Sequence, residues 1–162
     1  MKSKTDLPQK YPDARLKAID DFWDLLKNET DWKPSRVEVN TFKTLGIARK
    51  KERNIVFALV FLDVLDKDGA PTVEFQNLRV DIQNTLSRLM RKSYAKVFET
   101  IPANRMNQST LVNFFAVQGY SEDTAEYQAK LFVKLCKDAN INLPNVESSF
   151  QRARFNKKRN AP

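Results

Sequence analysis

The spacing of apolar and polar positions divides this chain into helical segments joined by turns. In residues 13–28 the apolar side chains recur three or four positions apart, which predicts an amphipathic helix that buries one face. A shorter helix is expected from residue 36 or 37 to residue 45. Gly46 follows it directly and tolerates the left-handed backbone that commonly closes a helix.

The next segment, residues 48–65, is the most apolar. It begins with basic residues and continues through eight apolar ones, from Ile55 to Leu62. Its length favours a helix, whereas its content of valine and phenylalanine favours a strand, and we expect a helix. Residues 66–69 are a turn pattern and residues 71–75 predict a short edge strand, so a small β-hairpin should follow. This order of elements is that of a winged helix-turn-helix.

Helical spacing begins again after Arg79. We expect a helix from residue 82 to Pro102, a short helix over residues 109–117, a turn at Gly119 and a last helix over residues 121–140 with Ser121 as its N-cap. The expected fold class is therefore mainly α, with a winged helix-turn-helix-like half that carries a small β-hairpin and a second, three-helix unit.

The same pattern predicts the domain organisation. Residues 1–12 should be a flexible lead, residues 13–80 a winged-helix-like domain and residues 81–142 a three-helix unit. Residues 143–162 are basic and poor in apolar side chains, and we expect this tail to be disordered when free. With 162 residues and 41% hydrophobic content, the chain can bury one ordinary core or two small ones.

Charge changes this picture because it is concentrated in two places. The chain has 28 lysines and arginines against 20 acidic residues, a net charge of +8. Residues 43–53 and residues 147–162 each carry five basic residues and one acidic residue, so each contributes 5 − 1 = +4. Concentrated positive charge attracts polyanions, so the expected partner is nucleic acid.

The sequence also narrows the possible chemistry. It contains no histidine, which removes Ser-His and Cys-His nucleophile pairs and histidine metal ligands. We find no constellation of carboxylates or lysines in its place, and expect neither enzymatic activity nor a cofactor. A calcium-loop interpretation of Asp66 and Asp68 fails, because with Gly69 as the loop glycine the first and last ligands would be Val64 and Phe75.

Two further features indicate the compartment. The polar start of the chain lacks the apolar core of a secretory signal, and the longest apolar run is shorter than the ~20 residues that span a bilayer. The single cysteine, Cys136, lies in an apolar stretch and should be a buried thiol. We expect a cytoplasmic protein without membrane contact.

The candidate site is the basic turn at the expected start of the third helix, where a winged helix meets the major groove. Exposed cations at a helix amino end cost ~0.3–1 kcal/mol each, so a phosphate held there by side chains and free amides would relieve repulsion. The tail, which mixes aromatic and basic residues, could add charge and stacking. Alternatively, both segments are solvated faces that keep the protein soluble. The candidate contacts are Lys43, Arg49, Lys50, Lys51, Arg53, Asn54, Arg152, Arg154, Lys157, Lys158 and Arg159.

A longer motif carries a resemblance to a known family. Residues 59–72 read LVFLDVLDKDGAPT, a leucine-rich helix end followed by a D-x-D-G-x-P-T turn. This stretch resembles the prokaryotic family called domain of unknown function 5343, with further matches at Phe42, Leu45, Gly46, Phe75, Arg79, Tyr94, Phe98, Phe132 and Leu135. The family tends to have glycine where Asp63 stands. The resemblance implies a helical, winged-helix-like module and supplies no catalytic residues.

Two hypotheses follow. The first is a non-enzymatic regulator or accessory subunit that binds nucleic acid, expected to be double-stranded DNA, through the basic turn and the tail. The second is an adaptor that binds another protein or a second copy of itself through the apolar third helix and the second helical half. Neutralising Arg49, Lys50 and Lys51 should abolish nucleic-acid binding under the first hypothesis and leave partner capture intact under the second.

Overall fold

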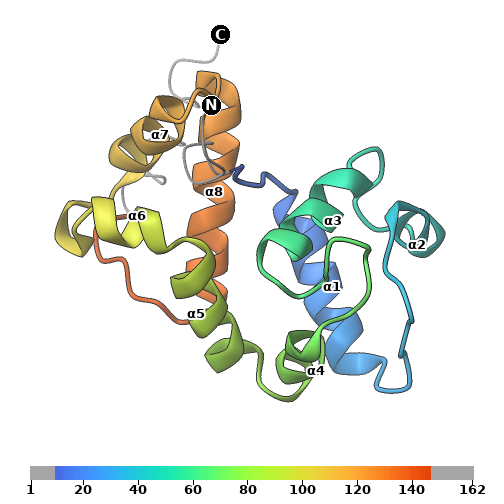
Figure 1. The fold of residues 1–162 in the computed structure, drawn as a ribbon. Coiled ribbons are helices and arrows are strands. Elements are labelled where there is room, and N and C mark those ends of the chain that lie inside the picture. Colours follow the sequence, from blue (N-terminus) through green and yellow to red (C-terminus); the bar gives the residue numbers. More distant parts are fainter. Residues whose placement is uncertain (1–9, 147–162) are drawn as a thin grey trace, which may run out of the picture.

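The computed structural model describes residues 10–146, whose regular structure is helical (Figure 1). Figure 1 shows helices α1–α4 grouped on one side of the molecule and α5–α8 on the other. The mainly α prediction is confirmed. The elements in chain order are α1 (Leu16–Asn28), α2 (Val39–Leu45), α3 (Glu52–Phe61), α4 (Val73–Val80), α5 (Ile82–Ser93), α6 (Ala95–Thr100), the 3-10 helix η2 (Ala103–Arg105), α7 (Gln108–Val117) and α8 (Glu122–Asp138).

The prediction of a small β-hairpin is wrong. Residues 10–146 contain no strand, and the segment forms a single antiparallel bridge between Leu65 and Pro71. The expected edge strand is instead the start of α4, because the Thr72 hydroxyl accepts the Glu74 amide at 3.2 Å and caps a helix there. Phe75 lies buried on that helix. Without a hairpin there is no wing, so the winged helix-turn-helix is not the fold of this part of the chain.

Helix α3 is shorter than expected, because the backbone turns left-handed at both of its ends. Lys50 precedes it with φ +68°, and Asp63 follows it with φ +67°. At the carboxyl end the Val64 amide bonds to the Leu59 carbonyl at 2.9 Å and the Asp63 amide to the Val60 carbonyl at 3.0 Å, the bond pair of a Schellman motif. A glycine would adopt this conformation without strain, which explains why glycine suits the position of Asp63.

Most of the other helices confirm the spacing argument. Gly46 closes α2 with φ +71°, and the Ser121 hydroxyl caps α8 by accepting the Thr124 amide at 3.2 Å. The expected helix from residue 82 to Pro102 is divided at Tyr94 into α5 and α6. Cys136 is buried on α8, and burial raises the pKa of its thiol above the ordinary range, so the expectation of a buried thiol is confirmed.

Tyr11 joins the two groups of helices. Its side chain is 3% exposed, and its ring contacts Phe61 of α3, Tyr94 between α5 and α6, and Phe114 and Phe115 of α7. Its backbone amide donates to the Tyr120 hydroxyl and its carbonyl accepts from the Gln128 side chain, both at 3.0 Å. Residue 11 therefore belongs to the core, although we expected a flexible lead up to residue 12; residues 1–9 lie outside the described part.

A second connection runs between α1 and α8. The Trp23 indole donates to the Asp138 carboxylate at 2.9 Å, and the Lys134 ammonium contacts Asp20 at 2.6 Å. One continuous cluster of buried side chains extends through both groups of helices and ends at Val146. None of the described helices combines the length and apolar character needed to span a bilayer.

Candidate nucleic-acid interface

The basic turn lies between α2 and α3 and has an unusual backbone. Gly46, Ala48 and Lys50 are all left-handed, with φ values of +71°, +58° and +68°. For a residue with a side chain this conformation costs about 1–2 kcal/mol, so Ala48 and Lys50 hold strain. The turn leaves the side chains of Arg49, Lys50 and Lys51 exposed to solvent.

The carboxylate of Glu52 occupies the amino end of α3. It accepts the Lys50 amide at 3.1 Å. Hydrogen bonds from the backbone amides of Glu52 itself and of Lys50, with smaller contributions from the charges of Lys43 and Arg15, lower the pKa of this carboxyl. A phosphate at this helix end would therefore meet an internal anion, which already accepts the Lys50 amide. Any phosphate must be held by the surrounding side chains.

Asn54 is the one candidate in the described part that the structure removes from the site. Its side-chain amide is half-buried and donates to the Asp13 carboxylate at 3.3 Å. This bond fastens the start of α3 to the segment before α1. The side-chain amide of Asn54 is therefore engaged within the fold.

Arg15 adds a cation that the sequence argument missed. It is exposed at the N-cap of α1, and its charge contributes to the low pKa of Glu52, so it lies near the start of α3. Lys43, at the end of α2, approaches the same carboxylate. No sequence signal links residue 15 to residue 52, because only the fold brings them together.

These cations form what we call the basic surface: Arg15, Lys43, Arg49, Lys50, Lys51 and Arg53. All six are exposed, and within residues 10–146 none of them forms an ion pair. Some cations elsewhere in the described part are paired, for example Lys17 with Asp21 at 2.9 Å and Lys134 with Asp20 at 2.6 Å. Two carboxylates lie at the start of α3: Glu52 accepts the Lys50 amide, and Asp13 accepts the Asn54 side-chain amide.

The D-x-D-G-x-P-T motif has a structural role. The Asp66 carboxylate accepts the amides of Asp68 and Ala70 at 2.8 and 2.9 Å, which confirms Asp66 as a turn residue. Gly69 has φ +87°, and a Cβ placed there would lie 2.9 Å from the Val37 carbonyl oxygen. The described residues contain no group of three or more acidic or cysteine side chains that could hold a metal ion.

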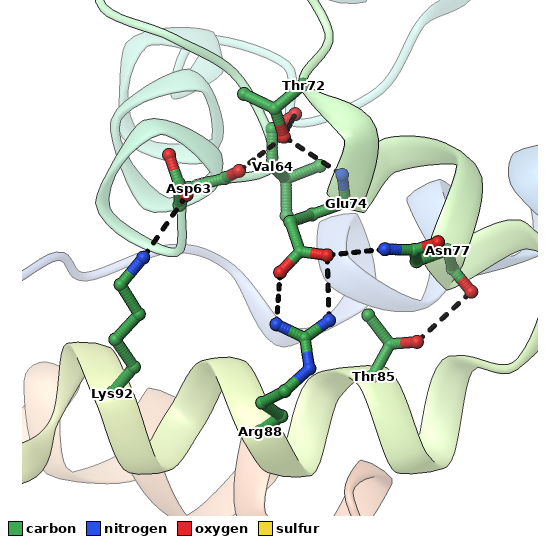
Figure 2. A network of polar contacts seen from close by, with 8 residues as sticks. All are labelled: Asp63, Val64, Thr72, Glu74, Asn77, Thr85, Arg88 and Lys92. Carbon is green, nitrogen blue, oxygen red and sulfur yellow. Dashed lines mark hydrogen bonds and ion pairs between the residues drawn. The ribbon is translucent and has the colours of Figure 1, made fainter.

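The same motif leads into an ion pair that joins α4 to α5 (Figure 2). Figure 2 shows the Arg88 guanidinium pointing from α5 at both carboxylate oxygens of Glu74, and the second of these contacts measures 2.7 Å. Hydrogen bonds from Arg88, and then from Asn77, lower the pKa of Glu74 to about 2. The Thr72 hydroxyl also donates to the Asp63 carbonyl at 2.6 Å. These groups stabilise the connection between the helices and are not free for chemistry.

The remaining candidates belong to the tail. Arg152, Arg154, Lys157, Lys158 and Arg159 lie outside the described residues. Residues beyond the boundary expected at residue 142 contact the core, because Val146 is fully buried and the Asn145 side chain donates to the Asn104 carbonyl at 2.8 Å.

Comparison with known families identifies the relatives of this chain. The model of a family of unknown function, DUF5343, matches residues 16–144. The resemblance inferred from the D-x-D-G-x-P-T motif is therefore confirmed. No curated protein and no solved structure was found to match.

Proposed function

The chain belongs to DUF5343, a family of unknown function, and we propose that it is a non-enzymatic nucleic-acid-binding protein that holds phosphates on its basic surface. One observation carries the proposal: six exposed cations from three separate segments gather around α3 without ion-pair partners among the described residues. Neighbouring positive charges without counterions repel one another, and a bound polyanion relieves that repulsion.

The backbone of the basic turn supports the same proposal. Ala48 and Lys50 are left-handed although neither is glycine. Backbone strain of this kind persists only when the surrounding structure imposes it, and it is enriched at binding sites. Here the imposed conformation aims the Lys50 amide at Glu52 and leaves the neighbouring cationic side chains in solvent.

The proposed role is that of a cytoplasmic regulator or accessory subunit. Three side chains of the described part that could act as a nucleophile or an acid have structural contacts instead: Cys136 is buried, Glu74 is bound to Arg88, and Asp66 closes a turn. The earlier expectation of a double-stranded partner depended on a winged-helix geometry, which is wrong. The proposal is therefore limited to contact with the phosphates of nucleic acid.

The test is a binding titration with labelled random-sequence oligonucleotides, followed by fluorescence anisotropy. The triple variant Arg49→Gln, Lys50→Gln, Lys51→Gln should lose most of its affinity. The matched control is the triple variant Lys27→Gln, Lys67→Gln, Lys96→Gln, which removes the same charge from exposed positions outside the basic surface. Equal losses in the two variants would show a non-specific effect of net charge and contradict the proposal.

A form that ends at Glu147 separates the contribution of the tail. It keeps Val146, the last described residue of the buried core. Retained binding by this form would assign the site to the basic surface. Binding lost with the tail would assign it to the tail cations.

A second candidate function, an adaptor or self-associating protein, is favoured by α4. Val73 and Val80 are seven residues apart on one face of that helix, and they are 73% and 78% exposed. Large exposed apolar side chains that share a face can mark a protein contact. If Val73→Ser with Val80→Ser abolishes a concentration-dependent oligomer in sedimentation, this candidate gains support; a wild-type monomer at all concentrations would count against self-association.

A further inference from the structure

The outward face of α3 combines one cation with apolar side chains. Arg53, in the first turn, is exposed, and Phe57 follows it four residues later with 37% of its surface exposed. Residues four apart on a helix are neighbours, with about 5–6 Å between their Cβ atoms. Val56 and Val60 lie half-buried beside Phe57, whereas Ile55 and its buried neighbours form the opposite face.

On this face Arg53 is the one side chain that could read a base pair. A helix in the major groove recognises bases with side chains that donate or accept hydrogen bonds. After Arg53 the one polar side chain on α3 is Asn54, and it is already bonded to Asp13. The amides at the helix start also face an internal anion, the carboxylate of Glu52. Helix α3 therefore presents one base-reading side chain, whereas a recognition helix typically brings three or four to the base edges.

The same arrangement fits a strand whose bases are unpaired. Proteins that bind single strands combine a positive surface for the backbone with aromatic rings on which bases stack. Phe57 is an exposed ring one helical turn from Arg53, and the basic turn lies just before that arginine. The charges of the surface complement phosphates, and the ring complements the face of a base.

Building on the proposed function, we propose that the partner of the basic surface is single-stranded nucleic acid. One base stacks on Phe57, and the phosphates on either side contact Arg53 and the cations of the basic turn. Stacking does not depend on which base is present, so this site binds with little sequence preference. Duplex ends and partly paired nucleic acids bind this site only through their unpaired nucleotides.

The test compares a labelled oligothymidylate with a duplex of equal length by fluorescence anisotropy, using the full chain. We expect the single strand to bind more tightly. Phe57→Ala should weaken single-strand binding by about five- to a hundredfold and leave duplex binding unchanged. Phe57→Leu keeps an apolar side chain of similar size but removes the ring. This variant should lose as much single-strand affinity as Phe57→Ala, because stacking needs the ring. Unchanged affinity would mean that Phe57 contributes only apolar packing. Tyr127→Ala removes an exposed ring from α8 and is the matched control.

The outcomes separate this inference from the proposed function. If the wild type binds neither oligonucleotide, both fail. A different result would overturn the single-strand inference alone. In that case single strand and duplex bind equally, the basic-turn triple variant abolishes binding of both, and the Phe57 variants change neither affinity. The proposed function would then stand. Polyglutamate is the third ligand: binding as tight as that of oligothymidylate and independent of Phe57 would point to an acidic protein partner and also overturn the inference.

Discussion

The backbone amide of Lys50 donates a hydrogen bond to the carboxylate of Glu52, with 3.1 Å between the nitrogen and Oε1. The donor residue, Lys50, has a left-handed backbone, and the bond places a negative charge at the positive end of the α3 dipole. The same carboxylate lies close enough to Lys43 and Arg15 for their charges to lower its pKa. Glu52 thus acts as an internal counterion of the basic surface.

Removing that counterion should strengthen binding of a polyanion. Glu52→Gln keeps an oxygen that can accept the Lys50 amide but removes the charge that repels phosphate. At the dielectric constant of bulk water one charge is worth about 1 kcal/mol at 4 Å, so affinity for an oligonucleotide should rise about three- to fivefold at low salt. Glu29→Gln removes an exposed charge elsewhere and is the control. Unchanged or weaker binding by a folded Glu52→Gln protein would contradict this view of the site.

The left-handed backbone at Asp63 predicts a stabilising substitution. Asp63 has φ +67°, and its ion pair with Lys92 measures 3.5 Å on the surface, where such pairs contribute little. Asp63→Gly should therefore raise the free energy of unfolding by about 0.5–1 kcal/mol, which urea titration can measure. Asp63→Ala loses the same ion pair without relieving the backbone and should not stabilise. Equal destabilisation by both variants would mean that the carboxylate, and not the backbone, decides stability at this position.

The ion pair between Glu74 and Arg88 predicts how stability depends on pH. Arg88 holds the pKa of Glu74 at about 2, below its ordinary value of 4.5. A carboxylate whose pKa is lower in the folded state stabilises the fold above pH 4.5 and loses that contribution as the pH falls toward 2. The stability advantage of the wild type over Glu74→Gln, measured by urea unfolding, should be full near neutral pH and shrink through this window. An advantage that does not change with pH would show that the pair adds no electrostatic stabilisation.

Removing either of two tyrosine hydroxyls near Tyr11 should change the stability of the fold in different directions. The Tyr94 hydroxyl is fully buried and has no hydrogen-bond partner among the described residues, so Tyr94→Phe should leave stability unchanged or raise it by about 1 kcal/mol. The Tyr120 hydroxyl accepts the Tyr11 amide, so Tyr120→Phe should cost about 1–2 kcal/mol. Thermal unfolding of the two variants gives the comparison. The reverse order would mean that Tyr94 has a partner in solution and that Tyr11 is not held by Tyr120.

Local signals predicted most of the helices because they act within a few residues. The apolar spacing of α1, the glycine that ends α2 and the serine that caps α8 each depend on near neighbours. The hairpin was predicted wrongly because Pro71 and Val73 favour an extended chain. The cap at Thr72 and the burial of Phe75 and Leu78, three residues apart, favoured a helix and decided the outcome.

The parts of the site that the sequence did not predict depend on contacts between distant residues. Arg15 joins the basic surface because the segment before α1 is fastened to α3 through Asp13 and Asn54. The same bond removes Asn54 from the candidate contacts. Tyr11 was assigned to a flexible lead, because its polar neighbours give no sign of the aromatic rings that surround it in the fold. Clustered basic residues could be recognised from the sequence, but their unpaired state could not.

The salt dependence of oligonucleotide binding tests the central claim most directly. For a single strand, the logarithm of affinity falls with the logarithm of salt concentration with a slope of about −0.7 per phosphate neutralised. Wild-type binding should weaken steeply with salt, and the triple variant Arg49→Gln, Lys50→Gln, Lys51→Gln should have a slope shallower by about 2, from three lost contacts. An equal slope in wild type and variant, or no binding at low salt, would show that the basic surface does not hold nucleic acid.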